Sequence, residues 1–323
     1  MKITDIAIFA FILLFPFSLA MDYNQKKSIA AIETKSIYEQ ALRIASEDAT
    51  KALLTSTDED GEDIEDKLKN PNLDVALERF NETMYINLNL KGDKLGQDAL
   101  KSFLPVKLVV AYDGYFLNVW ESVIDHMGRK QVVDIWLPKK FFVYYEASTN
   151  LIFNFTITDK VSIYDVSAGT YIEGKRADME LLYPSSVVLK STNFDNIRRQ
   201  TIVEIINNDL ELYSIKYNYI AKKFGYGYNF SIPVVSKNDW NNTIDGITFM
   251  AFLQGVPVPN TDIQINTYAF CASSLKNIHF YYGTSDMLYH KEECSVLTNK
   301  DIKFQNRKDA ASEGYFPCSI CKP

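Results

Sequence analysis

KLVVAYDGYFLNVW, residues 107–120, places two runs of β-branched and aromatic residues on either side of the dipeptide Asp113-Gly114. Residues of these types favour strands, and Asp-Gly between two such runs is the strongest short-range signal for a tight hairpin turn. The stretch therefore predicts a β-hairpin with its turn at Asp113-Gly114, and an antiparallel sheet around it.

Four more runs of the same composition follow the hairpin, separated by short polar turns, at residues 131–137, 141–145, 151–157 and 161–164. The chain as a whole is rich in aromatic side chains, with 20 Tyr, 20 Phe and 3 Trp among 323 residues. Aromatic and β-branched residues pack well on the pleated surface of a sheet. We therefore expect an antiparallel sheet of five or six strands with aromatic-packed faces.

The segments that flank this sheet have helical patterns. Residues 22–54 contain no Pro or Gly, and their apolar side chains recur at spacings of 4, 3, 4 and 4 along one face: Tyr38, Leu42, Ala45, Ala49 and Leu53. Residues 73–90 predict a second amphipathic helix that runs into a strand, and residues 195–223 predict a return helix packed on the sheet. Short strands are predicted after the return helix, at residues 226–235, 247–252, 263–272 and 278–282.

These patterns predict an α+β fold with a long N-terminal helix, an aromatic-rich antiparallel sheet with a packed return helix, and a small C-terminal module. Two motifs at the ends of the chain, described below, predict that the N-terminal helix is membrane-proximal and that the C-terminal module binds zinc. A chain of 323 residues is too long for one ordinary core. We expect four parts: a transmembrane anchor or signal segment at 1–21, a membrane-proximal helical region at 22–90, an α+β extracytoplasmic body at 91–285 and a metal-binding module at 286–323.

The overall composition excludes several classes of protein. Hydrophobic residues make up 47% of the chain and charged residues 23%, which rules out a disordered protein. The mean hydropathy of -0.14 rules out a polytopic membrane protein, and the net charge of -7 offers no basic surface for nucleic acid. The sequence contains no P-loop, Gly-x-Ser-x-Gly or His-Glu-x-x-His motif, and His126 and His279 are isolated. We therefore expect no catalytic residues and identify no small-molecule substrate.

A charge-free run of sixteen residues, 6–21, lies close to the N-terminus, with Lys26 and Lys27 behind it. A membrane-spanning helix needs about 20 apolar residues, whereas a secretory signal has an apolar core of about 7–15 residues and ends at small residues such as Ser18-Leu19-Ala20. An uncleaved anchor, a cleaved signal and a buried core helix are the three interpretations. We expect a single-pass anchor in the cell membrane with the body outside the cytoplasm, because the run continues without a break into the next helix. Secretion after signal cleavage is the alternative.

A hydrophobic N-terminal helix with an internal proline, Pro16, that continues into a long amphipathic helix ahead of a β-rich body resembles bacterial pilins and pseudopilins. It is also similar to the minor pilin-like proteins of tight-adherence systems. The resemblance covers residues 1–55 and is architectural. It implies a single-pass surface protein that contacts the membrane through its N-terminal helix and has protein partners in a surface or secretion assembly.

The C-terminus carries the one specific chemical signal of the chain. His290-Lys-Glu-Glu-Cys294 is followed, after twenty-three intervening residues, by Cys318-Ser-Ile-Cys321. Two close pairs separated by a loop are typical of a tetrahedral structural zinc site, in which Cys-x2-Cys brings two thiolates together from one tight turn. His-x3-Cys is expected to place its two ligands one helical turn apart. We therefore predict that His290, Cys294, Cys318 and Cys321 bind one structural zinc ion.

The residues around these ligands carry a second resemblance. YHKEEC at 289–294 and GYFPCSIC at 314–321 together resemble a small module that is often appended to bacterial nucleases and surface proteins. That module is similar to the metal-binding domain of the Ada repair protein, with a His in place of one Cys. The resemblance implies a compact zinc knuckle with all four positions as ligands and no open coordination site. Two alternatives remain open, namely free thiols and a disulfide of Cys318 with either Cys321 or Cys294.

Taken together, the patterns lead us to expect a non-enzymatic, membrane-anchored extracytoplasmic protein, a component of a bacterial surface, pilus-like or secretion assembly. The alternative is an exported enzyme or carbohydrate-binding protein with an aromatic cleft and a zinc ion that is only structural. Trp240, between Asp239 and Asp245, is the candidate sugar-stacking residue of that alternative, whereas a turn anchored by a Trp is the plainer interpretation. Cys271 is expected to be a buried small hydrophobic residue and not a nucleophile.

Overall fold

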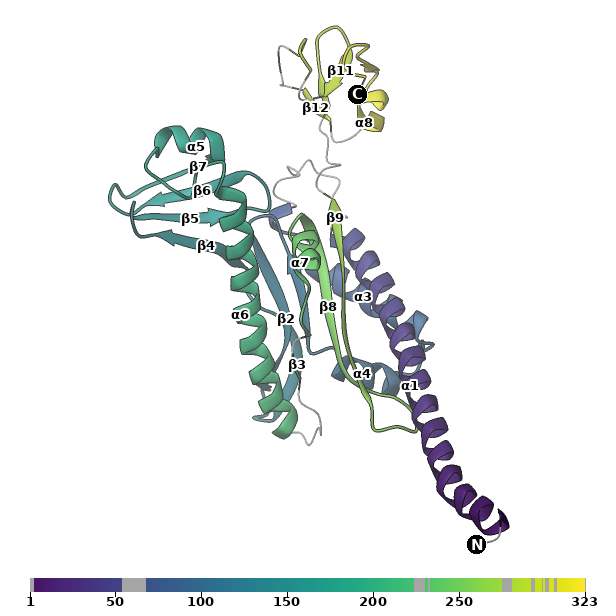
Figure 1. Cartoon of the computed structure of the whole chain (residues 1–323). Helices are drawn as coiled ribbons and strands as arrows, with labels where there is room; N and C mark the ends of the chain where they lie inside the picture. The colour runs from purple at the N-terminus through teal and green to yellow at the C-terminus, as the bar shows by residue number, and fades with distance from the viewer. Residues whose placement is uncertain are drawn as a thin grey trace.

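The computed structural model describes residues 3–53, 68–223, 230–231, 233–274, 281–291, 294–297, 299, 302–304 and 307–322. Figure 1 shows a long N-terminal helix beside a curled sheet, a second long helix across that sheet, and a small C-terminal module. The expected α+β class, N-terminal helix and antiparallel sheet are therefore confirmed.

The helices of the described residues are α1 (Ile3–Leu53), α3 (Leu73–Asn87), α4 (Lys94–Ser102), α5 (Arg176–Leu182), α6 (Phe194–Lys223), α7 (Lys237–Thr243) and α8 (Arg307–Ser312). The strands of the large sheet are β1 (Val106–Val110), β2 (Gly114–Ile124), β3 (Lys130–Trp136), β4 (Lys140–Glu146), β5 (Leu151–Phe155), β6 (Lys160–Asp165), β7 (Thr170–Lys175), β8 (Gly246–Pro257) and β9 (Gln264–Ser274). The strands of the C-terminal module are β10 (Tyr281–Gly283), β11 (Leu288–Lys291), β12 (Ile302–Phe304) and β13 (Phe316–Pro317).

The large sheet grows outward from the hairpin of β1 and β2. Its strand order is β7-β6-β5-β4-β2-β1-β8-β9, with β3 also paired to β2, and every pair is antiparallel. β2 pairs with β4 at its first two residues, Gly114 and Tyr115, and with β3 from Asn118 onward. The sheet has nine strands instead of the five or six predicted, because β7 joins one edge and β8 and β9 return from the C-terminal half to pair with β1.

The hairpin turn lies one residue earlier than predicted. The Ala111 N–H donates to the Gly114 carbonyl at 2.8 Å. The central turn residues are therefore Tyr112 and Asp113, and β2 begins at Gly114. A Cβ on Gly114 would lie 2.4 Å from the Lys140 carbonyl oxygen, at the point where β4 pairs with β2. The glycine thus allows the close approach of β4 and is not one of the two turn residues.

α1 and α3 pack together and cover one face of the sheet (Figure 1). The predicted apolar stripe of α1 is buried over most of its length, at Leu42, Ala45, Ala49 and Leu53. Because four of the buried side chains of α1 are alanines, the helix lies close enough to β9 for the Thr50 hydroxyl to donate to the Cys271 carbonyl at 2.7 Å. The rings of Phe80 on α3 and Phe249 on β8 lie 5.0 Å apart, which places the main core between these helices and the sheet.

α6 crosses the opposite face of the sheet and contacts both of its halves. Tyr115 at the start of β2 donates to the Asp209 carboxylate of α6 at 2.6 Å, and burial together with this bond raises the pKa of Tyr115. At the other end, Phe155 of β5 meets Phe194 of α6 edge-on, with ring centroids 5.6 Å apart. The helix therefore spans the junction at which β4 joins β2.

Some local predictions are wrong because the patterns behind them fit two kinds of element. The helix predicted at 73–90 ends at Asn87, and a second helix, α4, follows where a strand was predicted. A strand was predicted at 226–235. Its described residues, 230–231 and 233–235, have no regular structure, and residues 226–229 and 232 lie outside the described part of the chain. The short helix α7 follows directly after it. Apolar runs this short fit a strand or a helix equally well.

The prediction of a single-pass membrane anchor is wrong. In the part of the chain that the structure describes, no helix is both long and apolar enough to cross a membrane. The physical reason lies in the length of the charge-free run. It covers sixteen residues of a 51-residue helix and is followed directly by Asp22, Lys26 and Lys27, whereas a span needs about 20 apolar residues.

Candidate metal centre

The C-terminal module has a small sheet and a small core of its own. Its strand order is β12-β10-β11-β13, in which β11 and β13 are parallel and the other pairs are antiparallel. Four buried apolar residues form a cluster separate from the main core: Tyr281, Tyr289, Phe304 and Ala310. The edge-on contact of Tyr281 with Tyr289, at 5.6 Å between ring centroids, holds the β10–β11 hairpin on this cluster.

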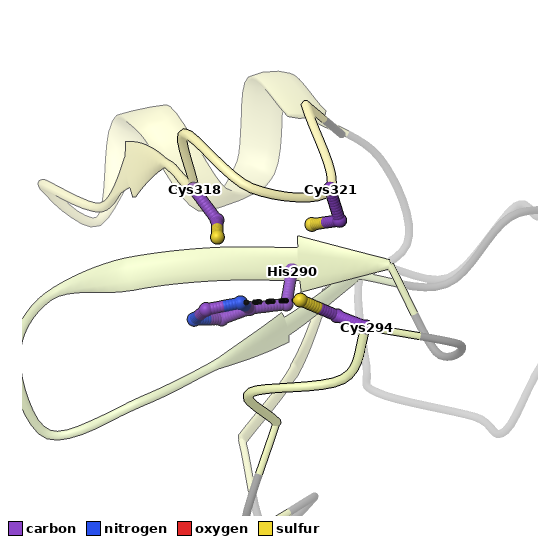
Figure 2. A group of neighbouring side chains, drawn as sticks. All are labelled: His290, Cys294, Cys318 and Cys321. Atoms are coloured by element: carbon purple, nitrogen blue, oxygen red, sulfur yellow. Dashed lines mark hydrogen bonds between the residues drawn. The ribbon is translucent and has the colours of Figure 1, made fainter.

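The four predicted ligands come together at the end of this sheet. The ligand atoms of His290, Cys294, Cys318 and Cys321 all lie within 4.8 Å of one another. His290 is 2% exposed, Cys318 is 3% exposed and Cys294 is also buried, whereas Cys321 is half-buried. Figure 2 shows the three sulfur atoms and the His290 ring directed into one small space between β11 and the loop that follows β13.

Strand pairing, and not helical spacing, brings the two pairs of residues together. His290 lies in β11 and Cys294 lies beyond its end, so the expected helical turn between them is wrong. The Cys318 N–H donates to the Tyr289 carbonyl at 3.0 Å and continues the parallel pairing of β13 with β11. This pairing places Cys318 beside His290. The turn that follows it, in which the Lys322 N–H donates to the Cys318 carbonyl at 3.1 Å, brings in Cys321.

Backbone N–H groups point at two of the sulfur atoms. The Lys291 N–H donates to Cys321 Sγ and the Ile320 N–H donates to Cys318 Sγ, each at 3.4 Å. Burial raises the pKa of the Cys318 thiol, but N–H groups of Cys321 and Ile320 outweigh it and hold this pKa below its usual value. For Cys321, burial and the neighbouring thiols raise the pKa. Of these two thiols, Cys318 therefore ionises first, and a nearby cation favours the thiolate form of both.

The geometry of this cluster fits one tetrahedral ion after small side-chain movements. With metal–sulfur bonds of about 2.3 Å and metal–nitrogen bonds of about 2.0–2.1 Å, the edges of a tetrahedron are about 3.5–3.8 Å. His290 Nδ1 lies 3.3 Å from Cys294 Sγ, close to such an edge. All separations lie within 4.8 Å, so none exceeds a tetrahedral edge by more than about 1 Å. All four cysteines are free, so no disulfide competes for these sulfurs.

The far side of the His290 ring has a partner that the sequence reasoning missed. Nε2 of His290 lies 3.1 Å from Thr284 Oγ1, in the turn that joins β10 to β11. That hydroxyl also lies within hydrogen-bond distance of Asp286 Oδ1 and of the Leu288 carbonyl. A Thr-x-Asp sequence is a common turn, so it carried no signal by itself.

The other candidate residues lie outside this cluster. Cys271 is half-buried on β9, where burial raises the pKa of its thiol. His126 is exposed in the turn between β2 and β3, and His279 lies outside the described residues. Trp240 lies on α7 and is only 5% exposed, so its ring face is not available to a sugar. The open cavity beside it, of about 1210 Å³ between α6 and α7, is lined mainly by polar side chains.

Comparison of the chain with protein-family models, with curated proteins and with solved structures found no match in any of the three. The chemistry of the site therefore follows from its own residues. These are one imidazole and three thiols, buried together on a small sheet.

Proposed function

We propose that His290, Cys294, Cys318 and Cys321 bind one structural zinc ion, and that the chain is a non-enzymatic component of a protein assembly. The observation that carries the metal site is the convergence of four ligand atoms within 4.8 Å in a largely buried space. A random surface cluster of this composition is rare, because cysteine and histidine make up only 4 and 3 residues of the chain.

The donor set favours zinc among the common metal ions. Three thiolates and one imidazole are soft ligands in a closed tetrahedral arrangement, which is the pattern of structural zinc sites. Calcium and magnesium prefer oxygen ligands, and the cluster offers none. Three thiolates around a divalent ion leave one net negative charge, which the N–H groups of Lys291 and Ile320 partly offset.

Four protein ligands leave no coordination position for a catalytic water, and this supports a structural role. The module needs such an ion because its own core is small. Among the described residues of the module, four buried apolar side chains form that cluster, which is a small core for a domain that folds alone. Metal binding would then supply a large part of the folding free energy of the module.

The assembly role is supported by an exposed apolar surface on α1. Leu14, Phe17 and Ile32 of α1 are 65%, 64% and 68% exposed. The N-terminal part of this helix projects beyond the sheet in Figure 1. Apolar side chains grouped on a surface mark a site of interaction with another molecule. The alternative of a carbohydrate-binding cleft has less support, because Trp240 is buried beside the polar cavity.

The zinc site is tested by the metal content of the purified full chain. We expect one zinc per chain by elemental analysis. Cobalt(II) in place of zinc is expected to give the intense thiolate-to-metal absorption and the visible bands of a tetrahedral site. Cys271→Ser is the matched control, since it removes the cysteine that lies outside the cluster and should leave the stoichiometry unchanged. A metal-free chain with a disulfide between two of the cluster cysteines would contradict the proposal.

The assembly role is tested by photocrosslinking in cells that produce the chain. A crosslinking residue in place of Phe17 or Ile32 is expected to give discrete protein adducts, because these side chains are exposed and apolar. The same residue in place of Lys237, exposed on α7, is the control and should give none. Adducts at Lys237 alone, or at none of the three positions, would contradict a partner on α1.

A further inference from the structure

We propose that Thr284 and Asp286 hold the His290 ring so that Nδ1 binds the metal, and that they thereby set how tightly the module retains it. This inference rests on the proposed zinc site. The two ring nitrogens of His290 have different surroundings: Nδ1 lies 3.3 Å from Cys294 Sγ, and Nε2 lies 3.1 Å from Thr284 Oγ1. Only Nδ1 faces the other three ligands (Figure 2).

The chemistry of imidazole then assigns the direction of each hydrogen bond. An imidazole that binds a metal through Nδ1 is neutral and carries its one ring proton on Nε2. Nε2–H therefore donates to Thr284 Oγ1. The Thr284 hydroxyl proton is left to donate to the Asp286 carboxylate, or to the Leu288 carbonyl at 3.0 Å. The result is a chain of hydrogen bonds that runs from the carboxylate through the hydroxyl to the metal-binding ring.

The β10–β11 hairpin places the Thr284 hydroxyl in position for these hydrogen bonds. Tyr282 is the register partner of His290, and Thr284 follows Tyr282 by two residues, so all three lie on one face of the hairpin. The Thr284 N–H donates to the Leu288 carbonyl at 2.9 Å and closes the turn. The position of the hydroxyl is thus set by the backbone of the same hairpin that carries the ligand.

Two consequences for the metal follow. The hydrogen bond to Nε2–H excludes the other tautomer and ring flips, so less conformational freedom is lost when the ion binds. The negative Asp286 carboxylate, at the end of this series of hydrogen bonds, makes Nδ1 of the imidazole a stronger electron-pair donor to the metal. Loss of such an outer partner commonly weakens metal affinity about 10- to 100-fold. We expect Thr284→Val to lower the zinc affinity by a factor in this range. Asp286→Asn should lower it by less, since the Thr284 hydroxyl remains.

The experiment measures zinc affinity of the full chain by competition with a chromophoric chelator. Thr284→Ser is the matched control because it keeps the hydroxyl, and we expect it to bind zinc as the unchanged chain does. Two further measurements distinguish the proposed role of Thr284 from a role in stabilising the turn alone. The cobalt(II) form of Thr284→Val should keep the absorption of three bound thiolates, and nitrogen-15 spectra of the zinc-loaded unchanged chain should show the His290 proton on Nε2.

The outcomes separate this inference from the site on which it rests. Equal zinc affinity of Thr284→Val and the unchanged chain, or a His290 proton on Nδ1 in the zinc-loaded chain, would overturn the inference and leave the zinc site standing. An unchanged chain that binds no zinc would defeat the site itself. Should Thr284→Val not fold, the exposed Asp286 provides the test: Asp286→Asn with unaltered affinity and unaltered zinc release would also overturn it.

Discussion

Cys318→Ser is expected to abolish zinc binding and to unfold residues 281–322 while the nine-stranded sheet stays folded. The Cys318 side chain is 3% exposed, and its sulfur is one of four atoms that converge on the proposed ion. Because the described core of the module has four buried apolar residues, we expect that it does not hold the module together without metal. Structural zinc in small modules contributes an apparent binding free energy of about 10–16 kcal/mol, which exceeds the whole stability of a module this small.

The two parts of the chain can be followed separately. All three tryptophans, Trp120, Trp136 and Trp240, belong to the large sheet and its helices, so their fluorescence reports that part alone. Amide hydrogen exchange in β10, β11 and β12 reports the module. We expect Cys318→Ser, or a strong chelator added to the unchanged chain, to remove the protection of these strands from amide hydrogen exchange. The unfolding transition of the large sheet, followed by tryptophan fluorescence, should stay unchanged. Cys271→Ser is the control, and protected module strands in Cys318→Ser would contradict the prediction.

Asp134→Ala is expected to destabilise the sheet by about 3 kcal/mol, because it leaves a buried ammonium group without its counter-charge. Lys107 lies in the central strand β1, and its side chain is 1% exposed. Its Nζ donates to Asp134 Oδ2 at 2.9 Å and to Asn118 Oδ1 at 3.0 Å. The Asp134 side chain is 26% exposed, so water partly screens the pair, and we place the loss at the lower end of the range of about 3–5 kcal/mol for buried pairs.

The matched control removes the lysine instead of its partner. Lys107→Met keeps a long apolar stem in β1 and leaves Asp134 able to turn toward solvent, so we expect a change in the free energy of unfolding within about 1 kcal/mol. The measurement is urea unfolding followed by tryptophan fluorescence, since Trp120 and Trp136 lie on strands next to the pair. A loss larger in Lys107→Met than in Asp134→Ala would show that the ion pair itself, and not the unpaired charge, governs stability.

Much of the fold could be predicted because its signals are local. Apolar spacing along α1 and α6, and strand composition around Asp113, depend on residues a few positions apart. The pairing of β8 with β1 could not be predicted, because it joins residues more than a hundred positions apart and no short pattern specifies a strand partner. The buried Lys107 was missed for the same reason, since its partner Asp134 lies two strands later in the chain.

The sequence by itself determined the antiparallel hairpin at residues 107–120, the long helices and the four residues that form the buried His/Cys group. These follow from the chemistry of side chains and from short spacings: strand-forming runs around one turn, and cysteines close enough to share an ion. Only the tertiary structure decided that His290 reaches the cysteines from a strand, with Thr284 behind its ring. The physical reason is that spacing limits which residues can meet, whereas strand pairing sets the direction from which each side chain arrives.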